Sequence, residues 1–243
     1  MKIKSLLVSV LLTSAFYGDL FAKDSSSING IEQLALENDP EIIIANYIKA
    51  VGGKEKVESI KNASMTGEAS FMGQSITIKT VADSENERLL QSTSVGGNVM
   101  QQTVLKNGKA QIMAMGQVQE VPDEMTTLLK TQTFVFPEPR YQEMGYALSY
   151  EGTEEIEGES THKIKISAPN GMITFEYYSV ASSLKVRTSS DATGDVTYSD
   201  YQEVDGVKFP MTLKIKNPML PEALVTKMTS VKFNQSLTEA DFQ

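Results

Sequence analysis

The sequence contains no cysteine and no tryptophan, and His162 is its single histidine. Without cysteine the chain forms no disulfide, offers no thiolate to a metal and carries no acylated N-terminal cysteine. A zinc site needs three or four His, Cys or carboxylate ligands, so one histidine gives a metal centre little support. The lack of tryptophan weakens the case for a site that stacks on sugars. We therefore expect no cofactor and no metal.

Basic residues are also scarce. Lys and Arg number 22 against 31 Asp and Glu, which gives a net charge of -9. Phosphate binding needs a basic surface, so this balance argues against nucleic acid as a partner. The glycine-rich motifs G-x-x-x-x-G-K-[ST] and G-x-G-x-x-G are absent, so nucleotide binding has no support either.

Catalytic signatures are equally sparse. Ser160 precedes His162 by two residues within GESTH, but this is not the G-x-S-x-G elbow of a hydrolase. Neighbours on one strand are poorly placed to act as nucleophile and base. We expect no catalytic residue and no enzyme, although a hydrolase with two facing carboxylates stays open as a minor alternative.

The first residues resemble an export signal. Lys2 and Lys4 precede the apolar run SLLVSVLLTSAF, and Ala22 is the expected last residue removed. No second apolar run approaches membrane-spanning length. We expect a signal peptide over 1–22, a flexible polar leader over 23–39, and one domain over 40–243. The expected location is the bacterial periplasm, as a soluble protein that is exported by the Sec route and is not itself lipidated.

A helix is predicted after the leader. Asp39 can cap it, Pro40 suits its first position and Glu41 favours its positive end. Gly52 and Gly53 end it, and KEKVESIKN can add further turns.

From residue 62 onward apolar residues recur with period two, which predicts strands. Turn dipeptides that favour hairpins separate the runs: Gly96-Gly97, Asn107-Gly108, Asn170-Gly171 and Asp205-Gly206. Leu184 and Val186 alternate with Lys185 and Arg187 in one such run. We count ten or eleven short strands, which predicts an antiparallel meander. Residues 121–140 break the pattern with helical spacing after Pro122 and a proline-rich FVFPEP, so a short helix and a stiff loop interrupt the meander.

The stretch VKFPMTLKIK, residues 207–216, poses the main question. Its odd positions are all apolar, and its even positions are polar apart from Pro210. A strand with this pattern has one apolar face and one wet face. The apolar face contacts either a packed core or a hydrophobic ligand. Twelve methionines, which adapt their shape to varied partners, favour a deformable apolar cavity over the alternative of a Met-tolerant core.

Four segments resemble the LolA/LolB-like superfamily of outer-membrane lipoprotein-sorting proteins. They are IIIANYIKAVGGKEKVESIKNASMTGEA (42–69), YEGTEEIEGESTHKIKIS (150–167), YSDYQEVDGVKFPMTLKIK (198–216) and VKFNQSLTEADFQ (231–243). The resemblance implies a mainly β (α+β) fold, an unclosed antiparallel β-barrel of about eleven strands with helices covering the concave opening. It also implies acyl chains or lipid-modified proteins held beneath those helices. Similar domains accompany M16-type peptidases, but their H-x-x-E-H motif is absent here.

The leading hypothesis is therefore a periplasmic lipid- or lipoprotein-binding carrier that holds acyl chains in an apolar cavity. The alternative is a non-enzymatic sensor or scaffold that binds a protein partner in the cell envelope. The resemblance transfers no cargo-binding residue, and the sequence leaves the oligomeric state open. From the alternation we expect cavity-wall residues at Ile76, Ile78, Ile112, Phe209, Met211, Leu213 and Ile215. Lid residues are expected at Met125, Leu128, Leu129, Phe134 and Phe136. For each of these wall and lid residues, a place in the packed core is the alternative.

Overall fold

The computed structural model describes residues 38–114, 116–191, 194–217 and 222–243. The expected signal peptide over 1–22, and all but the last two residues of the leader over 23–39, lie outside the described residues. In the part of the chain that is described, no helix is both long enough and apolar enough to span a membrane.

Two helices open the described chain. Helix α2 spans Pro40–Val51 and α3 spans Lys54–Ser59. The side chain of Asp39 accepts a hydrogen bond from the backbone N–H of Glu41 at 2.8 Å, and Gly52 ends α2 at a φ of 146°. The sequence prediction of this helix, with its cap and its glycine stop, is confirmed. The backbone at Gly52 leaves little room for a side chain, because an added Cβ would lie 2.9 Å from the carbonyl oxygen of Gly206.

The rest of the described domain is mainly strand. The first six strands are β1 (Asn62–Phe71), β2 (Gln74–Asp83), β3 (Arg88–Val95), β4 (Asn98–Lys106), β5 (Lys109–Ala114) and β6 (Gln117–Glu120). Helix α4 (Asp123–Thr131) and the 3-10 helix η1 (Glu138–Arg140) follow. The remaining elements are β7 (Ala147–Ile156), β8 (Glu159–Ser167), β9 (Ile173–Ser179), β10 (Lys185–Ser190), β11 (Gly194–Val204), β12 (Val207–Lys216), β13 (Leu224–Phe233) and η2 (Glu239–Phe242).

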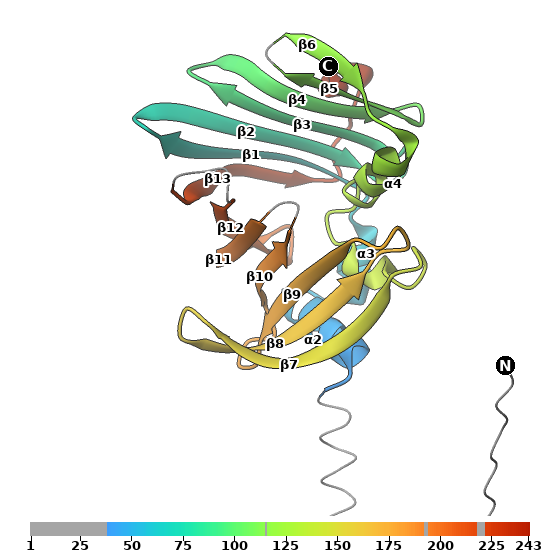
Figure 1. The fold of residues 1–243 in the computed structure, drawn as a ribbon, viewed down its shortest axis with the longest axis vertical. Helices are drawn as coiled ribbons and strands as arrows, with labels where there is room; N and C mark the ends of the chain where they lie inside the picture. The colour runs from blue at the N-terminus through green and yellow to red at the C-terminus, as the bar shows by residue number, and fades with distance from the viewer. Residues whose placement is uncertain (1–37, 115, 192–193, 218–221) are drawn as a thin grey trace, which may run out of the picture.

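All thirteen strands form one antiparallel sheet in the order β6-β5-β4-β3-β2-β1-β13-β12-β11-β10-β9-β8-β7. Every neighbouring pair is a consecutive hairpin except β1 and β13, which join the two halves. The sheet curves into an open half-barrel with β6 and β7 as its free edges, and α2, α3 and α4 lie toward its concave side (Figure 1). The predicted unclosed barrel with covering helices is confirmed. The strand count exceeds the expected eleven because short strands such as β6 carry too few apolar residues to be recognised.

Three of the four predicted turns have the backbone that their residues favour. Gly96-Gly97, Asn107-Gly108 and Asp205-Gly206 have positive φ at both positions, between 52° and 84°. This geometry matches the twist of the flanking strands, so each pair closes a two-residue hairpin. At the fourth dipeptide only Gly171 has positive φ, and the connection from β8 to β9 is longer.

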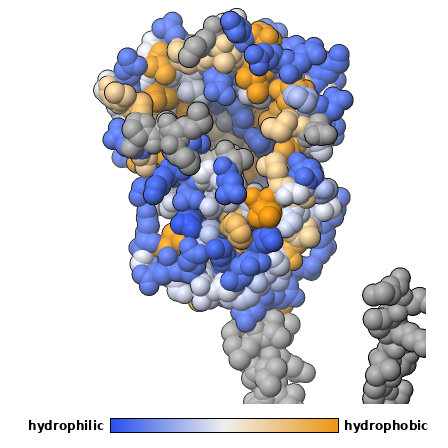
Figure 2. Space-filling view, viewed as in Figure 1, coloured by the Kyte–Doolittle hydropathy of each residue, from blue (hydrophilic) through white to orange (hydrophobic). Residues whose placement is uncertain are grey.

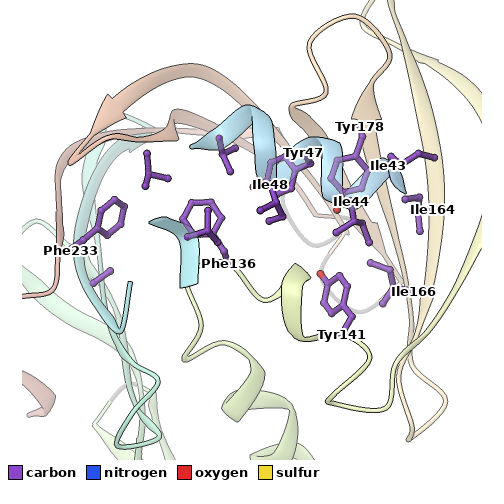
Figure 3. Close-up of a cluster of buried hydrophobic side chains, with 14 residues drawn as sticks. Ile43, Ile44, Tyr47, Ile48, Phe136, Tyr141, Ile164, Ile166, Tyr178 and Phe233 are labelled. Atoms are coloured by element: carbon purple, nitrogen blue, oxygen red, sulfur yellow. The ribbon is translucent and has the colours of Figure 1, made fainter. Parts of the chain in front are cut away.

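The largest core lies where α2 packs on the concave face. Ile43, Ile44, Tyr47 and Ile48 of α2 face Ile164, Ile166 and Tyr178 of the sheet (Figure 3). Their spacing follows the helical period, so one stripe of α2 is buried and the opposite side is exposed.

Two smaller cores stabilise the other half of the sheet. On the concave face Ala82, Leu89, Leu105 and Ala110 form a row across β2–β5, and Leu129 of α4 packs against it. On the outer face Val81 and Leu90 pack against Phe242 of η2. The row beneath Leu129 fixes α4 over the first half of the sheet.

The apolar face of residues 207–216 begins in the main core. Val207 is 2 % exposed, and the ring of Phe209 packs edge-on against both Phe136 and Phe233, at centroid distances of 6.4 and 6.0 Å. Further along β12, Met211, Leu213 and Ile215 are only half-buried. The strand thus contacts packed core at its start and more open space toward its end.

Candidate functional site

The seven expected wall residues share the concave face. Leu213 of β12 pairs with Thr226 of β13, and Ala69 of β1 pairs with both Thr226 and Ile76 of β2. Directly paired residues of antiparallel strands point to the same side, so these four residues form one row across four strands. Ile78, Ile112 and the odd positions of β12 lie on the same face by alternation.

This face is chemically mixed. Ile78 pairs with Thr93, which pairs in turn with Gln101, and Ile112 lies between Thr103 and Gln119. Amide and hydroxyl side chains therefore separate the isoleucines of β2 and β5. In the space-filling view, hydrophobic residues are interspersed with hydrophilic ones over the upper half of the molecule, and the lower half is mostly hydrophilic (Figure 2). The structure brings Ile76 and Ile78 together on β2, whereas Leu213 on β12 and Ile112 on β5 each lie three strands away, on opposite sides of β2.

The expected lid residues occupy three different environments. Leu128 and Phe134 line a cavity beside α4. Leu129 packs on the core of β2–β5, and Phe136 is buried in the main core. Met125 is 53 % exposed and contacts neither core. One helix thus presents a solvent-facing, a cavity-facing and a core-facing side.

The cavity beside α4 has a volume of about 650 Å³. Such a volume lies within the range of about 300–1,000 Å³ that small-molecule sites occupy. Two segments supply its apolar lining. The segment between β6 and β7 contributes Leu128, Phe134, Met144 and Tyr146, and the connection between β8 and β9 contributes Ala168 and Pro169. Lys130, Thr131, Thr133 and Asn170 add polar groups, so the cavity suits an amphiphilic ligand.

A few polar contacts fix α4 over this cavity. Lys130 forms an ion pair with Glu87 at 2.7 Å, and the two side chains are 40 % and 55 % exposed. The hydroxyls of Thr131 and Tyr146 lie 3.1 Å apart, and Gln91 donates to Gln132 at 2.9 Å. Exposed ion pairs contribute at most about 1 kcal/mol each. These polar contacts therefore add little to the packing of Leu129 on the sheet, which is the main attachment of α4.

A buried charged cluster anchors the far end of the same segment. Lys185 of β10 forms ion pairs with Glu138 of η1 and Glu176 of β9, and the Lys185–Glu176 distance is 2.5 Å. All three side chains are at most 9 % exposed. The Lys185 ammonium also lies 5.5 Å from the ring centre of Tyr47 and 5.7 Å from that of Tyr178.

Burial alone would lower the pKa of Lys185, but the two carboxylates outweigh it and raise that pKa well above its ordinary value. Burial raises the pKa of Glu138, with Lys185 opposing the shift. Burial also raises the pKa of Tyr141 and Tyr178, whose hydroxyls donate to Glu176 at 3.0 and 2.5 Å. The sequence reasoning missed this cluster. The only signal was a glutamate placed between two prolines in FPEP.

The described residues contain no group of three or more acidic, histidine or cysteine side chains that could hold a metal ion. His162 lies on β8, where its ring is 5.9 Å from that of Tyr150. Ser160 lies on the same strand and pairs with Glu155 across β7 and β8.

Comparison with known proteins gives likeness at the level of fold. No family model matches the chain, and no curated protein matches it. A DUF1329 family protein from Desulfovibrio piger superposes with a TM-score of 0.54 at 10 % identity, covering 83 % of this chain and 95 % of the other. The LolA superfamily protein NE2245 from Nitrosomonas europaea gives 0.51 at 9 % identity, covering 81 % and 97 %. The chain therefore has a LolA-like fold.

Proposed function

We propose that this protein is a carrier of the bacterial periplasm that holds the acyl chains of a lipid or a lipid-modified protein. The observation that carries the proposal is the cavity of about 650 Å³ beside α4, lined by Leu128 and Phe134 within a LolA-like fold. The export signal expected over 1–22 supports the location.

The chemistry of the cavity favours an amphiphile. Apolar walls can take up an acyl chain at about 0.8 kcal/mol for each CH₂ removed from water. Lys130 and Asn170 at the same cavity can contact a polar head group. The half-buried residues Met211, Leu213 and Ile215 supply further apolar surface on the concave face, and we include all seven wall residues in the proposed ligand surface.

Loading needs an opening, and the contacts of α4 suggest how one forms. The packing of Leu129 and exposed pairs such as Lys130–Glu87 hold the helix, while Glu138 and Lys185 anchor the end of the connecting segment. Raising α4 would expose Leu128 and Phe134 and leave the anchored end in place. A ligand that binds the raised state more tightly would shift the population toward it.

The first test is native mass spectrometry of protein purified from the periplasm without detergent, followed by extraction into organic solvent. We expect a mass excess that is extracted as a discrete lipid. Added cis-parinaric acid, whose fluorescence rises in apolar surroundings, should then bind to the delipidated protein.

A matched pair of variants locates the site. Leu128→Asp places a charge in the cavity and should weaken parinarate binding at least tenfold. Met125→Asp changes the exposed side of the same helix and should leave binding unchanged. A clean apo mass with no uptake of parinarate, or equal effects of the two variants, would contradict the proposal.

The sensor or scaffold alternative has one observation in its favour. Edge strand β6 is exposed along all four of its residues and offers unpaired backbone groups. An extended segment of an envelope protein could pair with it by strand addition. If the purified protein carries no lipid and captures a protein partner through β6, the sensor or scaffold function is favoured.

A further inference from the structure

A second cavity, of about 420 Å³, lies between α2 and η1. It is separate from the cavity beside α4, and the two have no lining residue in common. Its walls are mainly apolar, with Ile44, Ala45 and Ile48 on one side and Pro139 and Leu148 on the other. Nothing in the proposed carrier function uses it.

Glu138 lines this cavity and is incompletely satisfied. Its side chain is 3 % exposed, and its Oε1 atom accepts a hydrogen bond from Lys185. Its Oε2 atom is buried and has no hydrogen-bond partner among the described residues. A buried carboxylate oxygen without a donor carries a desolvation cost that a suitable ligand group would remove.

The charges around Glu138 show which group would suit it. Lys185 supplies one positive charge for the two carboxylates of Glu138 and Glu176. Tyr141 and Tyr178 both donate to Glu176 and not to Glu138. The cluster therefore lacks one donor at Glu138, which is one of the residues that line the cavity. A positively charged N–H group would restore both the charge balance and the hydrogen bond.

The mouth of the cavity favours a negatively charged group instead. Lys49 and Lys54 line it and are exposed. Lys49 forms no ion pair with a described residue, and Lys54 has only a loose one with Glu58 at 3.8 Å. The carboxylate of Glu41 at the same rim accepts a hydrogen bond from the side-chain amide of Gln142 and keeps its charge, so the rim carries two ammonium groups against one carboxylate. Two available ammonium groups thus favour an anion at the entrance.

We propose that this cavity binds a short aliphatic zwitterion, with its ammonium end at Glu138 and its anionic end between Lys49 and Lys54. The methylene chain between the two charges lies along Ile44, Ile48 and Leu148. A bare amine meets repulsion at the mouth, and a bare acid meets the unsatisfied carboxylate inside. Only a molecule that carries both charges matches the whole cavity.

Isothermal titration calorimetry of the purified protein with three six-carbon probes tests whether binding requires both charges. 6-Aminohexanoate should bind at least tenfold more tightly than hexylamine, and hexanoate should not bind measurably. Dihexanoylphosphatidylethanolamine, used as a fourth probe, distinguishes a lipid head group from a free amino acid as the source of the same chemistry. Equal binding of hexylamine and 6-aminohexanoate, or binding of none of the probes, would overturn the proposal.

Variants of the lining residues test whether 6-aminohexanoate binds in this cavity. Glu138→Gln should abolish binding of 6-aminohexanoate, and Lys49→Gln should reduce it several-fold. Because Glu138 is buried and its variant risks unfolding, Ala45→Phe provides a second test, since it blocks the cavity from an exposed helix position. Asn46→Phe, one residue further and outside the lining, is the matched control. Unchanged binding to Ala45→Phe, or equal loss in both phenylalanine variants, would contradict the site.

Discussion

The Nζ atom of Lys185 lies 2.5 Å from the Oε1 atom of Glu176, although neither side chain is more than 9 % exposed. These residues belong to neighbouring strands, and the second carboxylate on Lys185 comes from η1, in the segment that crosses from β6 to β7. The ammonium therefore fixes the end of that segment to the sheet. Loss of the Lys185 ammonium should therefore lower the stability of the fold more than loss of any other ion pair among the described residues.

Lys185→Met should lower the free energy of unfolding by about 3–5 kcal/mol, because it leaves two carboxylates buried without a counter-ion. Urea denaturation followed by far-ultraviolet circular dichroism measures the change. Lys214→Met removes an exposed pair with Glu157 and should cost at most about 1 kcal/mol. A loss at Lys185 no larger than at Lys214 would show that the cluster is hydrated and contributes little.

Asp83 should make stability depend on pH in the acid range. Burial alone would raise the pKa of Asp83, but hydrogen bonds from Arg88 and Asn86 outweigh it and hold that pKa below its ordinary value. The unfolded state therefore binds the proton first as the pH falls. The stabilisation is complete above about pH 4 and is lost as the pH drops through the folded pKa.

The matching variant is Asp83→Asn. At pH 7 it should cost about 3 kcal/mol, from the loss of charge-assisted hydrogen bonds, and this difference from the parent protein should shrink toward pH 2. Urea midpoints measured across that range give the comparison. Glu85→Gln, exposed in the same turn, should change stability by less than about 0.5 kcal/mol. A pH-independent cost at Asp83 would rule out its carboxylate as the source.

Thr226→Val should stabilise the protein by about 1 kcal/mol, because it replaces a buried hydroxyl that lacks a partner with a methyl of similar shape. Thr226 is 3 % exposed, and its Oγ1 has no hydrogen-bond partner among the described residues. Thermal unfolding by calorimetry measures the effect. The same substitution at Thr161, whose hydroxyl donates to the carbonyl of Glu154 at 2.7 Å, should destabilise. Destabilisation by both changes would mean that an ordered water satisfies Thr226.

Asp39→Ala should cost about 1 kcal/mol, since it removes the side-chain acceptor from the first turn of α2. Asp39→Asn keeps an acceptor at the cap and should be close to neutral. Urea midpoints of the two variants give the difference. If alanine and asparagine behave alike, the cap contributes nothing to the stability of the domain.

Local signals predicted most of the fold. Asp39, Pro40 and Gly52 defined α2 because caps and breakers act within a few residues. Asn107-Gly108 and Asp205-Gly206 placed hairpins for the same reason. The half-barrel itself came from resemblance, because no local rule states that β1 pairs with β13.

Tertiary packing decided what local signals could not. Alternation groups Lys185 with the polar positions of its strand, yet the structure buries it, because Glu138 arrives from a distant segment to share its charge. Leu128 and Leu129 are neighbours with the same chemistry, and only the orientation of α4 separates the cavity-lining residue from the core residue. The sequence could therefore not separate the sides of α4, and the role of the five residues as a lid stays a prediction.

The pairing of β1 with β13 has a kinetic consequence. Each half of the sheet is a run of local hairpins that can form early, whereas Ala63 must meet Phe233 across almost the whole domain. Closing so long a loop costs conformational entropy before any contact between the halves repays it. The two meanders should therefore assemble separately, and their joining at this seam should set the rate of refolding.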